Sequence, residues 1–455
     1  MPDIPRLVFA APYSAGGKTT FACGLMRVLQ NRGLKPAAFK CGPDYVDAAY
    51  HKATLNSETA NIDLFFCGGA DLARGLVAEG SQGAGLAVIE GVMGYYDGAG
   101  GVTTISSTWD MAVKLEAPVI LILHARGITQ TASALVQGLA SFRSPSGLAG
   151  VVLNCCRPTL HKKLAPLIER DCGLPVLGYL PLNDDYTFKS RNLGLYMPEE
   201  LENFEARLET LAGQMEKTLD IDTLLKIARS APPLARGRLP HLEPVSENQF
   251  SIAVAKDKAF AFYYDENLSL MRKLGAGLKI FSPLNDSQLP SGIHGLYLGG
   301  GYIEVYAEQL AANSSMRQSI RQAFEKGLPT LAEGGGFLYL QQKLVDACGR
   351  AHDMAGALPG VSGRGDKRAR FGYINITAKK DNLMCLRGQS IAAHEFHEWD
   401  SDCPGDDFIA QKPADDRNWL CGVAGESYYA GFPQMYFYNN PDFLRRFLKK
   451  AAAYR

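Results

Sequence analysis

The 455-residue sequence has no excess charge of either sign, no long apolar run and no CxxC pair among its ten cysteines. Lys plus Arg and Asp plus Glu each number 47, so no net charge attracts the chain to nucleic acid or to an anionic membrane. No apolar run reaches the ~18 residues that a membrane-spanning helix needs, and residues 1–6 lead into an expected strand without a signal-peptide pattern. Cysteines scattered without such a spacing are typical of proteins whose thiols stay reduced. We therefore expect a cytoplasmic protein that binds neither nucleic acid nor membrane.

Short apolar segments alternate with helical patterns through residues 1–229, and the apolar segments lie at 7–10, 86–89, 118–123 and 150–153. Continuous apolar strands separated by helices are typical of a parallel sheet covered on both faces. Residues 230–248 are rich in proline and polar groups, which favours a linker. Residues 249–455 are expected to form a second α/β unit, with strands at 251–255, 295–298 and 329–331. The predicted fold class is therefore α/β in two domains.

Residues 11–20, Ala-Pro-Tyr-Ser-Ala-Gly-Gly-Lys-Thr-Thr, follow the first expected strand and open a helical pattern. This is the context of a phosphate-binding P-loop, where backbone N–H groups at the start of a helix hold anions. The loop is a variant because Pro12 stands where the full motif has glycine, and a chance glycine-rich turn is the alternative. Lys18 would reach the terminal phosphates and Thr19 would bind Mg²⁺. The candidate nucleotide-binding residues here are Ser14, Gly16, Gly17, Lys18, Thr19 and Thr20.

Two acidic clusters follow expected strands, one at residues 40–47 and one at residues 90–98. Glu90 ends an apolar strand, so its side chain should emerge at the carboxyl edge of the sheet, where open α/β folds bind ligands. Carboxylates at that edge can hold the metal ion that bridges nucleotide phosphates. The alternative is a set of solvated acids in turns.

Residues 331–340, Leu-Ala-Glu-Gly-Gly-Gly-Phe-Leu-Tyr-Leu, have the pattern of a nucleophile elbow: an apolar run, a sharp turn of small residues and a second apolar run. The position where a nucleophile should stand is Gly334, which has no side chain. The sequence thus predicts the backbone of a covalent catalytic site without its attacking atom.

Several motifs in one order span almost the whole chain: Lys18-Thr19, 42–47, 90–94, Asp97, Asn154, 190–195, 298–302, 394–397 and 428–438. Together they resemble the cobyrinate a,c-diamide synthase family, glutamine amidotransferases of corrinoid biosynthesis. The resemblance implies a P-loop amidoligase domain of the dethiobiotin synthetase type, followed by a class I glutaminase-like domain.

The chemistry that the resemblance implies is amidation of a tetrapyrrole carboxylate, with cobyrinate as the leading substrate. ATP would phosphorylate the carboxylate and ammonia would then form the amide, while Mg²⁺ and Lys18 stabilise the moving charge. By the same resemblance, Mg²⁺ would be held by Thr19, Asp47 and Glu90, and the carboxylate-activation site would be lined by Asp44, Tyr45 and Asp97. Asn154 is a candidate for binding the adenine edge, with a helix-capping asparagine as the alternative. A homodimer is a further expectation from the family.

In the resembled family, a cysteine at the elbow attacks glutamine and a histidine acts as base. The expected Glu-Cys-Gly-Gly appears here as 333–336, with glycine at 334, and His397 matches the base. A packed structural histidine is the alternative, and His394 would point to the opposite face of a regular strand. Loss of the nucleophile predicts a persistent fold, a failed glutaminase and a carbon–nitrogen ligase that uses ammonia. Two alternatives remain: a glutamine-dependent enzyme for cobyrinate or a sirohydrochlorin-type substrate with position 334 altered, and a non-catalytic protein that binds nucleotide or tetrapyrrole.

Overall fold

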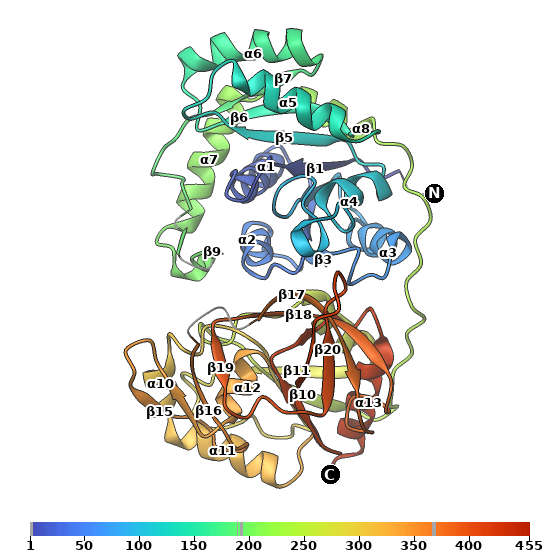
Figure 1. The fold of residues 1–455 in the computed structure, drawn as a ribbon, viewed down its shortest axis with the longest axis vertical. Helices are drawn as coiled ribbons and strands as arrows, with labels where there is room; N and C mark the ends of the chain where they lie inside the picture. The colour runs from blue at the N-terminus through green and yellow to red at the C-terminus, as the bar shows by residue number, and fades with distance from the viewer. Residues whose placement is uncertain (1–2, 189, 192–193, 366–369) are drawn as a thin grey trace. The chain divides into compact units, whose positions relative to one another are not determined.

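The computed structural model describes residues 3–188, 190–191, 194–365 and 370–455. It divides into two compact units, Met1–Leu239 and Pro240–Arg455, called here the N-terminal and C-terminal units (Figure 1). The division falls within the segment 230–248. Asn192 and Leu193, which belong to one of the motifs above, lie outside the described residues. Among the described helices, none combines the length and the apolar character that crossing a membrane requires.

The N-terminal unit is built on a seven-stranded sheet in the order β3-β2-β4-β1-β5-β6-β7, and every neighbouring pair is parallel. Its strands are β1 Arg6–Ala10, β2 Pro36–Cys41, β3 Ala60–Ile62, β4 Leu86–Glu90, β5 Val119–His124, β6 Leu148–Asn154 and β7 Val176–Leu180. Its helices are α1 Lys18–Asn31, α2 Val46–Leu55, α3 Ala70–Gly80, α4 Thr108–Lys114, α5 Thr131–Phe142, α6 Pro158–Cys172, α7 Phe204–Thr218 and α8 Ile221–Arg229. The strands β8 Ser190–Arg191 and β9 Gly194–Leu195 pair antiparallel. The predicted parallel sheet is therefore confirmed.

Strand β5 shows why this sheet is covered on both faces. Its side chains alternate between the faces, as the two-residue period of a strand requires. Ile120 and Ile122 pack in one apolar cluster with residues of α1, α7 and α8, whereas Leu121 and Leu123 pack in a second cluster with residues of α5 and α6. Because both faces are buried, the strand reads as a continuous apolar run in the sequence.

The C-terminal unit has its own six-stranded sheet in the order β11-β10-β12-β13-β23-β22, parallel except at the β22–β23 edge. The strands are β10 Phe250–Ala255, β11 Ala276–Phe281, β12 Gly295–Leu298, β13 Thr330–Glu333, β22 Val423–Ala424 and β23 Tyr428–Gly431. The helices are α9 Asp265–Lys273, α10 Ala307–Ala312, α11 Ser314–Glu325, α12 Gly335–Leu340 and α13 Pro441–Ala453. This arrangement confirms the predicted second α/β unit.

Two further sheets complete the C-terminal unit. The first, β21-β20-β17-β18-β24, is antiparallel and consists of β17 Arg370–Ala378, β18 Ser390–His397, β20 Phe408–Gln411, β21 Asn418–Cys421 and β24 Gln434–Met435. The second, β15-β14-β16-β19, consists of β14 Lys343–Val345, β15 Ala351–Asp353, β16 Val361–Arg364 and β19 Trp399–Ser401. The strands of both sheets lie, in sequence, between the elbow and α13.

A candidate phosphate site and an elbow without a nucleophile

The P-loop runs from the end of β1 to the start of α1, which begins at Lys18. Gly17 precedes the helix with φ +96°, a conformation that side-chain-bearing residues rarely adopt. A Cβ at this position would also collide with the side-chain amide of Asn154. The local backbone therefore needs glycine before Lys18, and it directs the first N–H groups of α1 toward the carboxyl edge of the sheet, where an anion can bind.

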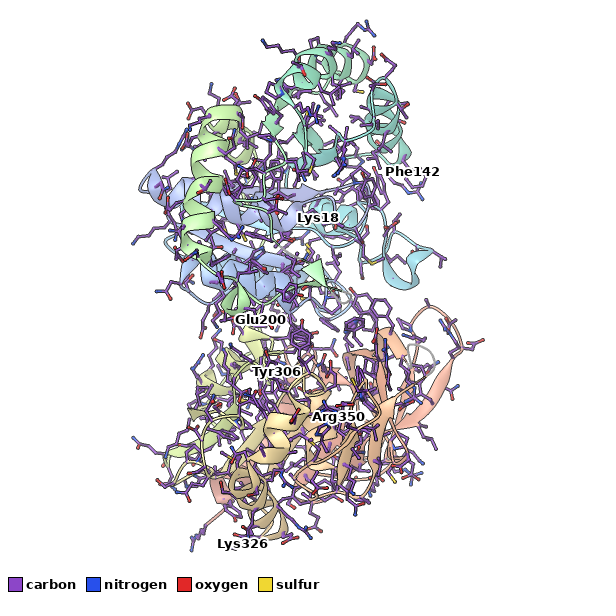
Figure 2. The ribbon with its side chains drawn as sticks, turned by 90° about the vertical axis from the view of Figure 1, so that its left-hand side faces the viewer. Lys18, Phe142, Glu200, Tyr306, Lys326 and Arg350 are labelled. Carbon is purple, nitrogen blue, oxygen red and sulfur yellow. The ribbon has the colours of Figure 1, made fainter. Side chains whose placement is uncertain are left out.

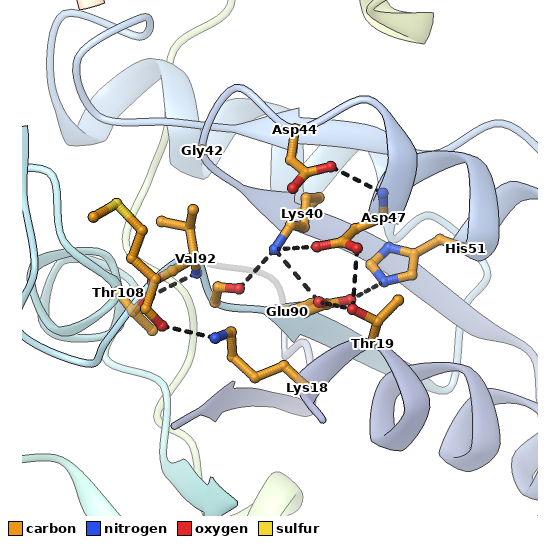
Figure 3. A network of polar contacts seen from close by, with 12 residues as sticks. Lys18, Thr19, Lys40, Gly42, Asp44, Asp47, His51, Glu90, Val92 and Thr108 are labelled. Atoms are coloured by element: carbon orange, nitrogen blue, oxygen red, sulfur yellow. Dashed lines mark hydrogen bonds and ion pairs between the residues drawn. The ribbon is translucent and has the colours of Figure 1, made fainter. Parts of the chain in front are cut away.

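A polar network beside this loop is formed by residues from the ends of β2 and β4 and from the helices α1 and α2 (Figure 3). The hydroxyl of Thr19 lies 2.8 Å from Glu90 Oε1 and 3.1 Å from Asp47 Oδ1, and it donates its single proton to one of these carboxylates. Lys40 Nζ lies 3.0 Å from Asp47 Oδ2 and 3.4 Å from Glu90 Oε1, and donates to the Gly91 carbonyl at 2.7 Å. His51 Nε2 lies 2.6 Å from the other oxygen of Glu90. The three predicted Mg²⁺ ligands thus lie together.

Burial and charge act in opposite directions on this network. Burial alone would raise the pKa of Glu90, but Lys40, His51 and Thr19 together lower it. Burial likewise would lower the pKa of Lys40, but the neighbouring carboxylates raise it. The pKa of Asp47 is raised by burial and by the nearby Asp44 and Glu90. The network therefore pairs a buried ammonium ion with a buried carboxylate, because either charge buried alone would be costly.

Lys18, labelled in Figure 2, begins α1, and its side chain reaches the loop that follows β4 (Figure 3). Its Nζ donates to the carbonyl of Met93 at 2.7 Å. Burial, followed by the charge of Lys40, lowers the pKa of Lys18 to about 8. Its hydrogen-bond partner in this structure is a neutral carbonyl, so an incoming phosphate would be a stronger, charge-assisted partner.

The acids predicted to line the carboxylate-activation site accept hydrogen bonds from backbone N–H groups of their own loops. Asp44 Oδ1 accepts from the backbone N–H of Asp47 at 2.9 Å, in the first turn of α2. Asp97 Oδ2 accepts from the backbone N–H of Gly94 at 2.9 Å. Tyr45 immediately precedes α2 and is half-buried. Their role toward a substrate stays a prediction.

Asn154 ends β6 and reaches across to the P-loop. Its Nδ2 donates to the Gly16 carbonyl at 3.0 Å, and its Oδ1 accepts from the Cys155 backbone N–H at 2.9 Å. In this structure the residue therefore supports the loop, while adenine binding stays a prediction. Of the remaining loop residues, Ser14 is exposed and Thr20 is half-buried in the first turn of α1.

The residues present fit a nucleotide with its metal ion. Thr19 places a hydroxyl beside two carboxylates that already surround one cation, the ammonium of Lys40. The described part of the chain contains no cluster of three or more His, Cys, Asp or Glu residues suited to a metal.

Sequence reasoning assigned no role to Lys40 or His51, although both belong to this network. His51 lies four residues after Asp47 on α2, which places the two side chains on one face of the helix. This four-residue spacing is the feature of the sequence that could have indicated that His51 lies beside Asp47. Lys40 stands one residue before the end of β2, next to β4, where it can reach Glu90.

The C-terminal unit does form an elbow at the end of β13. Gly334 has φ +53° and ψ −116°, and α12 begins at the next residue. Its N–H donates to the Gly431 carbonyl at 2.8 Å, while Glu333 accepts from the Tyr297 hydroxyl at 2.7 Å and the Met435 N–H at 2.8 Å. The turn that elsewhere presents a nucleophile is thus retained, with a glycine at its centre.

His397, predicted as a residual base, is held by packing. Its Nδ1 donates to the Trp399 carbonyl at 2.6 Å, and its ring stacks on Phe432 with centroids 3.8 Å apart. The atoms nearest to a Cβ placed on Gly334 belong to Gln434 and Gly300, and none belongs to His397. The role of His397 as base stays a prediction, and Gln434, which had no signal in the sequence, is the side chain that faces the elbow.

Comparison with known proteins assigns the two units. Residues 7–194 match the family model of the CobQ/CobB/MinD/ParA nucleotide binding domain, and residues 251–409 match that of the CobB/CobQ-like glutamine amidotransferase domain. A solved glutamine amidotransferase matches 44% of this chain and 98% of its own length at 16% identity, with a TM-score of 0.31. The chain therefore combines a domain of the CobQ/CobB/MinD/ParA nucleotide binding family with a CobB/CobQ-like glutamine amidotransferase domain.

Relatives that match almost the full length of the chain show which family it belongs to. Cobyrinate a,c-diamide synthases from Dehalococcoides mccartyi strain CBDB1 and from Caldanaerobacter subterraneus are 36% and 35% identical, over 98% of this chain and 98% of theirs. The protein of that name from Priestia megaterium is 35% identical over 98% of this chain and 97% of its own length. This chain belongs to the cobyrinate a,c-diamide synthase family, which confirms the predicted family.

Proposed function

We propose that this protein amidates side-chain carboxylates of a tetrapyrrole, cobyrinate foremost, with ATP, Mg²⁺ and ammonia. The observation that carries the proposal is the grouping of Thr19, Asp47 and Glu90 beside Lys18 at the carboxyl edge of a parallel sheet. The names of the full-length relatives support the substrate. Reaction in the cytoplasm and assembly as a homodimer are parts of the same proposal.

The reaction has two steps that each balance. A carboxylate oxygen of the macrocycle attacks the terminal phosphorus of ATP, the bond to ADP breaks, and an acyl phosphate forms. Ammonia then attacks the acyl carbon, the carbon–oxygen bond to phosphate breaks, and the nitrogen loses a proton. Phosphorylation is needed because a free carboxylate is a poor electrophile.

The residues of the N-terminal unit divide this work. Thr19, Asp47 and Glu90 would hold Mg²⁺, which when bound shields the phosphate charges. Lys18 would exchange the Met93 carbonyl for a phosphate oxygen and stabilise the charge that moves during transfer. Lys40 keeps the two carboxylates in place and offsets part of their charge.

The nitrogen source follows from residue 334. Hydrolysis of glutamine by this class of domain needs a covalent nucleophile at the elbow, and Gly334 supplies none. Removing such a nucleophile costs several orders of magnitude in rate. Free ammonia, or ammonia released by another protein, is therefore the proposed donor.

An amidation assay with two nitrogen donors tests the proposal. Purified protein, MgATP and cobyrinate are incubated with ammonium chloride or with glutamine, and amide products are counted by mass spectrometry. We expect product with ammonium chloride and none with glutamine. Equal turnover with glutamine would contradict the nitrogen source, and no product with either donor, on cobyrinate or on sirohydrochlorin-type substrates, would contradict the activity itself.

A matched pair of lysine variants ties the activity to the P-loop. Lys18→Ala should lower ammonium-dependent ADP release by about 10²-fold or more, since one charged donor to a transferring phosphate is lost. Lys35→Ala removes an exposed lysine of the same unit and should leave the rate unchanged. Full activity in Lys18→Ala would place phosphate binding elsewhere.

A further inference from the structure

The side chain of Gln434 fills the space directly in front of the elbow. Gln434 begins β24, which pairs with β18, and only 7% of the residue is exposed. A Cβ added to Gly334 would lie 2.9 Å from Gln434 Nε2. A Cβ added to Gly300 would collide with the same nitrogen. The carboxamide therefore lies between two glycines, in the space that a nucleophile's side chain would enter.

A thiol nucleophile needs a proton acceptor within hydrogen-bond reach. The side chain in that position here is an amide, whose nitrogen donates protons and whose oxygen is not basic at neutral pH. We propose that Gln434 occupies the place of the elbow's proton acceptor, so that the C-terminal unit lacks both the nucleophile and the base that would activate it. This inference deepens the proposed use of ammonia and rests on that proposal for its meaning.

The two histidines of β18 pack against groups other than the elbow glycine. His397 uses Nδ1 on the Trp399 carbonyl and stacks on Phe432, and its Nε2 lies 4.0 Å from Glu395 Oε1. His394 pairs with Gln434 across the strands, but its ring packs among Phe371, Tyr373 and Phe396. Neither imidazole is among the groups nearest to position 334.

If Gln434 stands in the place of the proton acceptor, repair of the elbow needs two substitutions, one at residue 334 and one at residue 434. Restoring the thiol alone, with Gly334→Cys, leaves it facing an amide, so it should react as an ordinary thiol and release no glutamate from glutamine. Adding Gln434→His supplies an imidazole next to the thiol. A neighbouring imidazole lowers a thiol's pKa from ~8.5 toward 7 or below, which raises the thiolate fraction near pH 7 by about 10-fold.

The experiment measures alkylation of the introduced thiol by iodoacetamide near pH 7, followed by mass spectrometry of the peptide that contains residue 334. We compare Gly334→Cys alone, with Gln434→His, and with Gln434→Leu as the matched control of similar size. Alkylation should be about 10-fold faster with Gln434→His than in the other two variants. Glutamate release is assayed in parallel, and we expect it only with Gln434→His. Melting curves verify that each variant is folded.

Three results would overturn the inference. The first is glutamate release by Gly334→Cys alone, because an acceptor other than residue 434 would then be present. The second is an alkylation rate that Gln434→His leaves unchanged. The third is a slower alkylation of the Gly334→Cys thiol when His394→Ala or His397→Ala is added. The thiol assay needs neither ATP nor macrocycle, so its outcome is independent of whether the amidation proposal holds.

Discussion

At the scale of single residues, two lysines share one acidic site and differ in what they contact. Lys40 forms ion pairs with Asp47 and Glu90, and these carboxylates raise its pKa. Lys18 contacts a backbone carbonyl, and burial lowers its pKa to about 8. Lys40 is thus committed to the structure of the site, whereas Lys18 has a charge available for a ligand.

The lowered pKa of Lys18 predicts pH-dependent nucleotide binding. Below pH 8 the ammonium is present and binds phosphate, and as pH rises through 8 the lysine loses its proton. The affinity for a non-hydrolysable ATP analogue with Mg²⁺ should therefore fall at high pH, with a slope approaching tenfold per pH unit. Calorimetric titrations between pH 7 and 9 measure it. Lys18→Met should bind the analogue weakly at every pH. If its affinity changed with pH as steeply as that of the wild type, the titrating proton would belong to another group.

Glu333 gives a second prediction, on stability. Burial raises its pKa to about 7, partly offset by the hydrogen bonds from Met435 and Tyr297. The folded state therefore keeps a proton that the unfolded chain loses above pH ~4.3. Its contribution to stability is present below that pH and is lost as pH rises to 7.

The measurement is urea unfolding of wild type, Glu333→Gln and the exposed control Glu308→Gln between pH 4.5 and 7. Relative to Glu333→Gln, wild type should lose on the order of 3 kcal/mol across this range. The Glu308→Gln curve should follow that of wild type. Parallel curves for wild type and Glu333→Gln would show that this carboxyl is ionised throughout.

The sequence predicted some of these residues and missed others for identifiable reasons. Thr19 and Glu90 were predictable because Thr19 lies at the start of the helix after the P-loop and Glu90 ends an apolar strand. Gln434 was not, since a buried glutamine in a two-residue strand carries no periodic signal. Its position opposite Gly334 depends on a pairing between segments about a hundred residues apart in the chain, which local patterns do not encode.

At the scale of elements, strands buried on both faces were the easiest to predict. β4, β5 and β10 read as continuous apolar runs because helices or sheets cover both sides. The strands β14, β15 and β16 have three or four residues each with mixed exposure. Such short segments have neither the length nor the alternation that sequence reading needs.

Helices α1 and α7 pack together, and each carries a glycine, but the two glycines differ in the space around them. A Cβ on Gly24 of α1 would lie 2.5 Å from Met215 Sδ and 2.9 Å from Leu211 Cγ, both on α7. Gly213 of α7 is exposed and has open space around its Cα. Gly24→Ala should cost about 1–3 kcal/mol by overpacking, whereas Gly213→Ala should stabilise by about 0.5–1 kcal/mol.

Thermal unfolding of the two variants tests this contrast, because both changes add one methyl group to the same helix pair. The sign of the effect is therefore set by the space available and not by helix propensity. Two stabilised variants would mean that Met215 and Leu211 move aside without cost.

At the scale of the whole molecule, two units with separate cores are joined by an irregular segment. Its first part stays with the N-terminal unit, because the Arg238 N–H donates to the Asp71 carbonyl at 2.9 Å. Its second part contains Glu243 and Glu247, which are exposed and lie outside helices and strands. Exposed irregular backbone is the preferred site of proteolysis.

Limited digestion with a glutamate-specific protease should therefore cut first after Glu243 or Glu247. Mass spectrometry should find two fragments that end or begin at these residues, and each should resist further digestion because its core is intact. Calorimetry of the digest should show a separate transition for each fragment. Early cuts at glutamates inside either unit would contradict two independently folded units.

The contact between Gln434 and the elbow also bears on how this lineage can change. A lone mutation that returned sulfur to position 334 would confer no benefit, and neither would a lone mutation that returned an imidazole to position 434. Selection would have nothing to retain at either intermediate. Under the proposed use of ammonia, two substitutions would have to occur together before glutamine could serve as the nitrogen source, and an organism carrying this chain would depend on whatever keeps its ammonia available.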